Sequence, residues 1–236
     1  MFEQVIGDWP QHDRFILTSC DDKYFIKYFP RFYKTYTEHW NLPIHLHIID
    51  PSAESLEKLK QLKLTFTHCE TNTDVLKWPY SYETYCQAQR FILLGHNLNK
   101  NQSVIVADVD SYALRQPSDK QQNLLGSDMA FTEYNGRLMA TFCNFHHGRR
   151  QQAKKAAVKM TNLIKETDMI GVDQFVIKEI FSKYRYNRLQ HKVWIRHLDV
   201  KTKEDLLHHN KCLIYHEKGT RGKGKGIKVS WTDIGL

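Results

Sequence analysis

Two aspartates, one residue apart, follow an apolar, β-branched run and are the residues best placed to do chemistry. The run Ser103-Val104-Ile105-Val106-Ala107 ends in Asp108-Val109-Asp110. In a strand, residues i and i+2 point to the same face, so we expect the carboxylates of Asp108 and Asp110 to converge. Carboxylate oxygens are hard donors that suit a divalent cation such as Mg2+ or Mn2+. The pair therefore predicts a metal site at the end of a strand.

The elements that must position this pair follow from hydrophobic patterning. The first two thirds of the chain predict strands over residues 14–19, 44–49, 64–68 and 104–107, and helices over residues 22–39, 52–62 and 81–98. Pro30 is expected to interrupt the first helix, and Ser52 is a suitable N-cap for the second. This alternation predicts an α/β fold with a central, mostly parallel sheet flanked by helices.

Polar side chains collect at one predicted edge of that sheet. Ligands of such sheets bind beyond the carboxyl ends of the strands. Asp108 and Asp110 follow one strand, and Ser19-Cys20-Asp21-Asp22 follows another. Later in the chain we expect antiparallel strands over residues 128–133 and 139–145, a helix on the face that includes Ala153 and Met160, a helix over residues 173–184, and a last strand over residues 211–215.

Composition limits the class of protein. The 236 residues are 41% hydrophobic, which is ordinary for a folded domain. No stretch approaches the roughly 20 apolar residues of a membrane span, and residues 1–10 do not have the pattern of a signal peptide. The five cysteines include no Cys-x-x-Cys pair, so we expect reduced thiols in a cytoplasmic protein. The net charge of +8 favours anionic partners.

The Asp108-Val109-Asp110 run resembles the Asp-x-Asp motif of glycosyltransferases with the A-type (GT-A) fold. Residues 18–24 resemble the nucleotide-recognition segment of glycosyltransferase family 8, the group of glycogenin and the lipopolysaccharide galactosyltransferases. The resemblance implies that Asp21 meets the base or ribose and that Tyr24 stacks on the base. In the alternative interpretation Asp21 or Asp22 only caps the following helix.

Two further segments match the same family in the same order. Residues 82–94 resemble the helix before the Asp-x-Asp strand, which implies that Arg90 grips phosphate or sugar oxygens of the donor; a solvated surface arginine is the alternative. Residues 171–177 resemble the family's Asp-Gln segment, which implies that Asp173 binds sugar hydroxyls and that Gln174 lies near the anomeric carbon. An Asp N-cap and a surface glutamine are the alternatives there. Asn144 is a weak candidate for a contact with the donor sugar.

Residues 214–219 resemble the family's His-x-x-Gly segment. This implies that His216 is the third protein ligand of Mn2+ (or Mg2+), with Asp108 near both the metal and the ribose. Arg221 or Lys223 would then grip the diphosphate. The segment Lys218–Lys228 carries five basic residues and four glycines, which predicts a flexible tail.

Taken together, the resemblance implies a single GT-A domain over residues 1–236. Its nucleotide-binding part spans about 12–115, its acceptor or sugar side about 126–215, and its flexible basic tail about 216–236. The expected activity is metal-dependent transfer of a sugar from a nucleotide-sugar, a UDP-sugar by this interpretation, to a saccharide or other hydroxyl acceptor, with retention of configuration. An inverting relative that uses Asp173 as general base, and a non-enzymatic basic domain that binds nucleic acid, are the alternatives.

Overall fold

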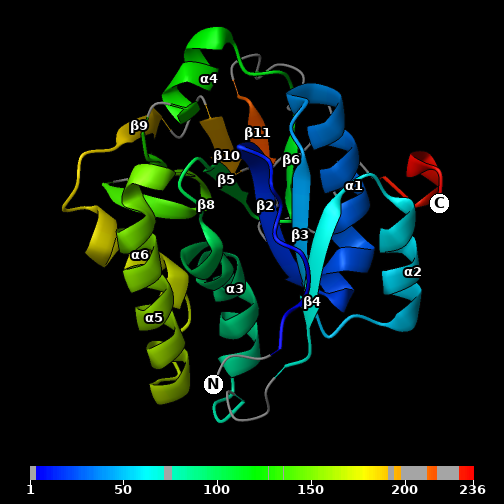
Figure 1. Ribbon diagram of the computed structural model, residues 1–236, viewed down its shortest axis with the longest axis horizontal. Helices are drawn as coiled ribbons and strands as arrows, with labels where there is room; N and C mark the ends of the chain where they lie inside the picture. The colour runs from blue at the N-terminus through cyan, green and yellow to red at the C-terminus, as the bar shows by residue number, and fades with distance from the viewer. Residues whose placement is uncertain are drawn as a thin grey trace.

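The computed structural model describes residues 4–71, 76–126, 128–134, 136–190, 194–197, 212–216 and 229–236. Within them a mixed sheet of eight strands is flanked by helices on both faces (Figure 1). Its spatial order is β1 (Ile6–Gly7), β4 (Thr65–Cys69), β3 (Ile44–Ile49), β2 (Arg14–Asp21), β5 (Ser103–Ala107), β8 (Arg137–His146), β7 (Ala130–Tyr134) and β9 (Asn187–Gln190). This arrangement confirms the predicted α/β class and the mostly parallel central sheet.

The order of the parallel strands reverses next to β2. Strands β2, β3, β4 and β5 run parallel, whereas β1 and β8 are antiparallel to their neighbours. From β2 the chain adds β3 and then β4 on one side, and it then crosses back to place β5 on the other side of β2. Such a reversal opens a crevice beyond the carboxyl ends of the two central strands. Here those strands lead into Asp21 and Asp108.

Helices cover both faces of this sheet. The helices are α1 (Asp22–Trp40), α2 (Ala53–Gln61), α3 (Ser81–Asn97), α4 (Asp119–Gly126), α5 (Arg150–Glu166) and α6 (Val172–Phe181). Because successive strand residues point to opposite faces, Phe15 and Leu17 pack with α3, α5 and α6, whereas Ile16 packs with α1 and α2. In Figure 1, α3, α5 and α6 lie towards the left of the view, and α1 and α2 lie on the right.

A second sheet has three strands and includes His216, one of the predicted metal ligands. Its order is β10 (Ile195–His197), β11 (Ile214–His216) and β6 (Ser111–Ala113), with β11 antiparallel to β6. Helix α1 holds β6 in place, since Ala113 N donates to Thr35 Oγ1 at 3.1 Å. The guanidinium of Arg31 also lies 4.4 Å from the ring centre of Tyr112.

Helix α1 continues through Pro30, where the sequence predicts an interruption. A proline inside a helix leaves the carbonyl four residues earlier without its backbone donor, and that carbonyl belongs to Ile26. The indole Nε1 of Trp231 donates to Ile26 O at 3.3 Å. A residue near the end of the chain therefore supplies the hydrogen bond that Pro30 cannot make.

The other predicted strands and helices are present within a few residues of their expected bounds. Ser52 caps α2 by accepting from Ser55 N, as predicted. Strands β7 and β8 form the predicted antiparallel pair. Sequence reasoning did not find β1, β6, α4, β9 and β10, all of which are short. Among the described residues, no helix has the length and apolar character needed to cross a bilayer.

Candidate metal centre

Asp108 and Asp110 converge through a turn and not through a strand, so the predicted route to the pair was wrong although the pair does converge. Strand β5 ends at Ala107, and β6 begins at Ser111. Ser111 N donates to Asp108 O at 3.0 Å, which closes a four-residue turn, and Ser111 Oγ donates to the same oxygen at 2.6 Å. Asp108 N in turn donates to Thr141 O of β8 at 3.0 Å. The turn presents both carboxylates at the carboxyl end of β5.

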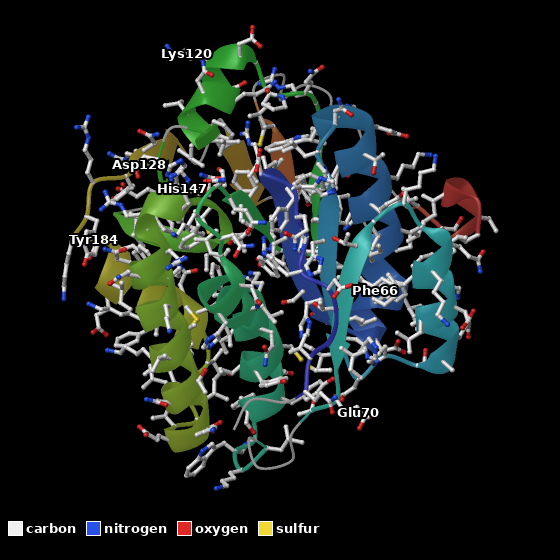
Figure 2. All side chains as sticks on the ribbon, viewed as in Figure 1. Phe66, Glu70, Lys120, Asp128, His147 and Tyr184 are labelled. Atoms are coloured by element: carbon white, nitrogen blue, oxygen red, sulfur yellow. The ribbon has the colours of Figure 1, made fainter. Side chains whose placement is uncertain are left out.

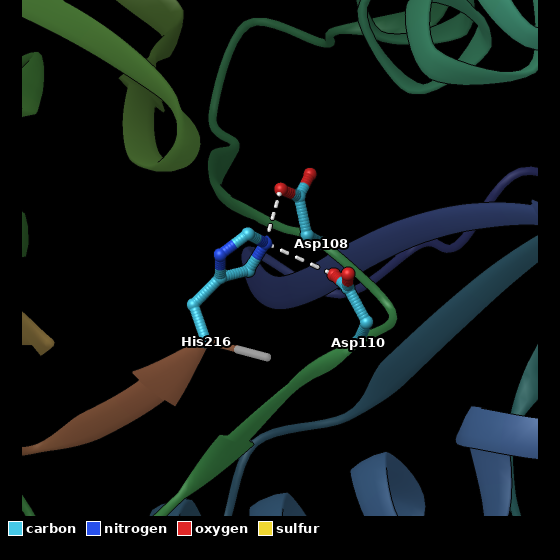
Figure 3. A group of neighbouring side chains, drawn as sticks. All are labelled: Asp108, Asp110 and His216. Atoms are coloured by element: carbon cyan, nitrogen blue, oxygen red, sulfur yellow. Dashed lines mark ion pairs between the residues drawn. The ribbon is translucent and has the colours of Figure 1, made fainter. Parts of the chain in front are cut away.

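Strand pairing brings His216 to this turn from a distant part of the chain. In the ladder between β6 and β11, His216 is paired with Ser111, the residue after Asp110. The imidazole points between the two carboxylates (Figure 3): its Nε2 lies 3.0 Å from Asp108 Oδ2 and 3.0 Å from Asp110 Oδ1. The three predicted metal ligands therefore lie together, and ligand atoms of all three lie within 4.8 Å of one another.

The electrostatics of this cluster favour a positive charge between the carboxylates. Burial by itself lowers the pKa of His216, but the charge of Asp110 and the hydrogen bonds to both carboxylates outweigh it and raise the pKa to about 10. The imidazolium thus occupies the position that a cation would take. One imidazole and two carboxylates form a donor set that suits Mn2+ or Mg2+, so the described residues fit a divalent ion.

Arg90 joins this cluster to Asp173. Its side chain comes from the middle of α3 and is only 5% exposed. Nη2 lies 2.5 Å from Asp108 Oδ1 and 3.2 Å from Asp173 Oδ2. Burial raises the pKa of Asp173, and Arg90 offsets part of that rise. Because Arg90 is buried and paired, it is not the solvated surface arginine of the alternative interpretation.

Asp21 and Tyr24 lie beside the same edge of the sheet. Asp21 is the N-cap of α1, and its Oδ1 accepts from Tyr24 N at 2.7 Å. Asp22 instead accepts from Ser52 N and Ser52 Oγ. The Tyr24 ring is 38% exposed, and its pKa rises to about 12 because of burial and the nearby charge of Asp110. Asp21 therefore does cap α1, and Tyr24 lies close enough to Asp110 for the charge of that carboxylate to raise its pKa.

Two other predicted site residues, Gln174 and Asn144, lie apart from the cluster. Both ends of the Gln174 amide contact β8: Oε1 accepts from Ala140 N at 3.0 Å, and Nε2 donates to Leu138 O. Asn144 is fully buried and bonds to Ser103 Oγ, at the opposite end of β5 from Asp108. Arg221 and Lys223 lie outside the described residues.

Sequence reasoning missed several residues that shape the site. Tyr36, buried in α1, shares a hydrogen bond of 3.1 Å with Ser111 Oγ and so supports the turn. At the start of α3, burial and the charges of Cys86, Asp21 and Asp50 raise the pKa of Tyr82, which places the first turns of α3 against the end of β2. Tyr82 and Cys86 are four residues apart and therefore lie on the same face of α3. This spacing is the feature of the sequence that could have predicted which face of the helix meets the site.

The comparisons with known proteins found no assignment: the sequence matches no protein-family model, and no curated protein is significantly similar to it.

Proposed function

We propose that this chain is a metal-dependent glycosyltransferase with a GT-A fold that transfers a sugar from a UDP-sugar to a hydroxyl acceptor. The single observation that carries this proposal is the convergence of Asp108, Asp110 and His216 beyond the end of β5. The strand order adds support, because β2 and β5 flank the reversal in the sheet where α/β folds bind nucleotides. The choice of a UDP-sugar as the donor rests on the resemblance to glycosyltransferase family 8.

In this proposal each residue of the cluster has a distinct task. Asp108, Asp110 and His216 hold the metal, Mn2+ or Mg2+. A bound divalent cation would neutralise the negative charge that develops on the diphosphate as it leaves. Arg90 fixes the orientation of Asp108 through its 2.5 Å contact and pairs with Asp173 on the sugar side. Asp21 and Tyr24 bind the nucleoside at the end of β2.

The contacts with the transferred sugar are assigned by the resemblance. Asp173 binds sugar hydroxyls, and Gln174 lies near the anomeric carbon once its amide leaves β8. This arrangement favours retention of configuration. In the inverting alternative, Asp173 or another carboxylate takes the proton of the acceptor hydroxyl. Arg221 or Lys223 would grip the diphosphate.

Thermal melting with donor fragments tests the proposal. We expect UDP together with Mn2+ to raise the melting temperature more than either alone, because ligands that bind only the folded state stabilise it. Asp110→Ala should abolish the shift. Glu38→Ala removes an exposed carboxylate from the last turn of α1 and should leave the shift unchanged. Absence of a shift with every nucleoside diphosphate and metal would contradict the proposed donor site.

A turnover assay identifies the reaction. Slow hydrolysis of one member of a panel of UDP-sugars in the presence of Mn2+ is the expected result, and the anomeric form of the released sugar separates retention from inversion. If the chain instead binds nucleic acid through its basic surface, binding should be sensitive to salt and indifferent to Asp110→Ala.

A further inference from the structure

A basic groove lies along the outer face of α5, away from the candidate metal centre. It has a volume of about 960 Å3 and is lined by residues at the end of α3, among them Gly95, His96 and Leu98, and by successive turns of α5 from Arg150 to Glu166. Helix α5 begins just after β8, whose last residue, His146, is paired with Ser103 at the start of β5. The groove therefore starts at the sheet edge opposite Asp108. In Figure 2, His147 lies across the molecule from Phe66.

The wall of this groove carries a large share of the excess positive charge of the chain. Residues 147–166 hold six Lys or Arg and one Glu. Arg149 is paired with Asp128 at 3.7 Å, and Lys159 with Glu179. Among the residues that the structure describes, Arg150, Lys154 and Lys155 make no ion pair, and all three are exposed. Three cations in a row along one helix are thus available to a partner.

The floor of the groove is apolar. Leu98 is buried at the end of α3, and Leu163 is half-buried on α5. Val158, which precedes Lys159 on α5, is 45% exposed. Two aliphatic side chains of α5, Val158 and Leu163, are therefore accessible beside the cationic wall.

The shape and chemistry of the groove favour one class of occupant. The lining contains no aromatic side chain, whereas grooves that bind single-stranded nucleic acid use aromatic rings as stacking platforms. The lining residues from Arg150 to Glu166 span about 24 Å of helix, at 1.5 Å per residue. A helix of about 16 residues has the same length. An apolar strip flanked by charges is the form of a groove that binds an amphipathic helix.

We propose that this groove docks an acidic amphipathic helix of a partner protein. The apolar stripe of that helix packs on Val158 and Leu163, and its carboxylates face Arg150, Lys154 and Lys155. A smaller cavity of about 360 Å3 adjoins the groove at the start of α5 and is lined by Lys100, His147 and Arg150 among others. It extends the cationic wall, so the partner helix also carries acidic residues at the end that lies there. This interaction is independent of the proposed transfer reaction.

A labelled model peptide tests this docking with the full chain. The probe is a fluorescein-labelled peptide of about 16 residues, with leucines along one face and glutamates beside them. We expect it to bind about tenfold more tightly than a scrambled peptide of the same composition. Lys154→Glu with Lys155→Glu should weaken binding about tenfold, since reversed charges at an interface oppose association. Val158→Asp should weaken it similarly by charging the floor.

Matched controls separate docking from simple charge attraction. Lys60→Glu with Lys63→Glu makes the same change in net charge near the end of α2, where both lysines are exposed; peptide binding should then be unchanged. Melting temperatures of all variants should match that of the parent, because every substituted residue is exposed. Equal binding of the scrambled peptide, full competition by polyglutamate, or equal loss in the Lys60 and Lys63 control would overturn the proposal.

Discussion

The imidazole of His216 and the carboxylates of Asp108 and Asp110 face a common point. Either a proton on His216 or a metal ion can lie there. His216 must be neutral to bind a metal, but the two carboxylates raise its pKa to about 10. A metal ion entering below that pH therefore has to displace a proton. We expect the affinity for Mn2+ to rise about tenfold per pH unit between pH 6.5 and pH 9, because each unit lowers the competing proton concentration tenfold.

Calorimetric titration in buffers of different ionisation enthalpy measures this release directly. At pH 7.5 about one proton should leave per ion bound. In His216→Asn both the release and the pH dependence should nearly vanish, and the affinity should be lower. An unchanged proton release in that variant would remove His216 from the ligand set.

Arg90 is a buried cation that pairs with the buried carboxylate of Asp173 and the partly buried carboxylate of Asp108. Removing one partner of a buried ion pair leaves an uncompensated charge, at a cost of about 3–5 kcal/mol. We expect Arg90→Ala to reduce the free energy of unfolding by that order, measured by urea denaturation at pH 7.5. In Arg90→Ala combined with Asp173→Asn the loss should be smaller, since one of the stranded charges is gone. If the two substitutions are additive, Arg90 does not act through Asp173.

The site could be predicted only as far as each residue had a local signal. Asp108 and Asp110 were found from their spacing, although a turn closed by Ser111 and not a strand aims them. His216 was found by resemblance and meets them through the register of β6 and β11. The use of Arg90 as a buried bridge had no signal in the sequence, because it depends on how α3 and α6 pack behind the sheet.

At the scale of helices, Pro30 and Trp231 form a pair that keeps α1 continuous. Trp231→Phe removes the indole donor to the Ile26 carbonyl, and Pro30→Ala supplies a backbone donor to the same oxygen. We therefore expect Trp231→Phe to be less destabilising in the Pro30→Ala background than in the parent. The coupling should be about 0.5–1 kcal/mol, the net worth of one hydrogen bond, and urea denaturation of the four proteins measures it. A coupling of zero would mean that Trp231 acts on α1 by packing alone, since its ring also lies 4.7 Å from that of Phe25.

Helices α3 and α5 approach each other closely at Gly95. A Cβ placed there lies 2.5 Å from Ala153 O and 2.5 Å from Ala157 Cβ, both on α5. Gly95→Ala should therefore reduce the free energy of unfolding by about 1–3 kcal/mol through overpacking, although alanine favours a helix by about 1 kcal/mol over glycine. Gly126→Ala, in α4, is the matched control: among the described residues, no atom outside the neighbouring backbone lies within 4 Å of its added Cβ, so it should be neutral or stabilising. Equal effects of the two substitutions would contradict the close contact.

Over the whole molecule, the long elements of the fold were predictable and the short ones were not. An apolar run such as residues 44–49 predicts a strand, and the helical spacing of the apolar residues of α5 predicts a helix, without reference to the rest of the chain. Strands β6 and β10 have three residues each, and they exist because partners far along the chain complete their ladders. The place of Pro30 in a continuous helix likewise depends on a tryptophan about 200 residues away. Tertiary contacts therefore decided what local pattern could not.

Two buried histidines of β3, which contact threonines of β4, should make the stability of the whole molecule depend on pH. His45 contacts Thr65 Oγ1 at 2.9 Å, and His47 contacts Thr67 Oγ1 at 3.0 Å. Burial lowers the pKa of each to about 3, whereas the unfolded value is about 6.5. Both are neutral in either state above pH 6.5. As pH falls below that value the unfolded chain binds the protons, so stability falls until pH 3.

The expected loss is about 1.4 kcal/mol per pH unit for each histidine. His216 does not oppose it in this range, because its raised pKa gives a contribution that is complete below pH 6.5 and declines only as pH rises towards 10. Urea denaturation at pH 6 and pH 5 measures the slope before most carboxylates titrate. Replacing His45 and His47 together by Asn should leave a shallower slope over that unit. If the double variant loses stability as steeply as the parent, the protons enter elsewhere, and these two rings are not what makes the sheet sensitive to acid.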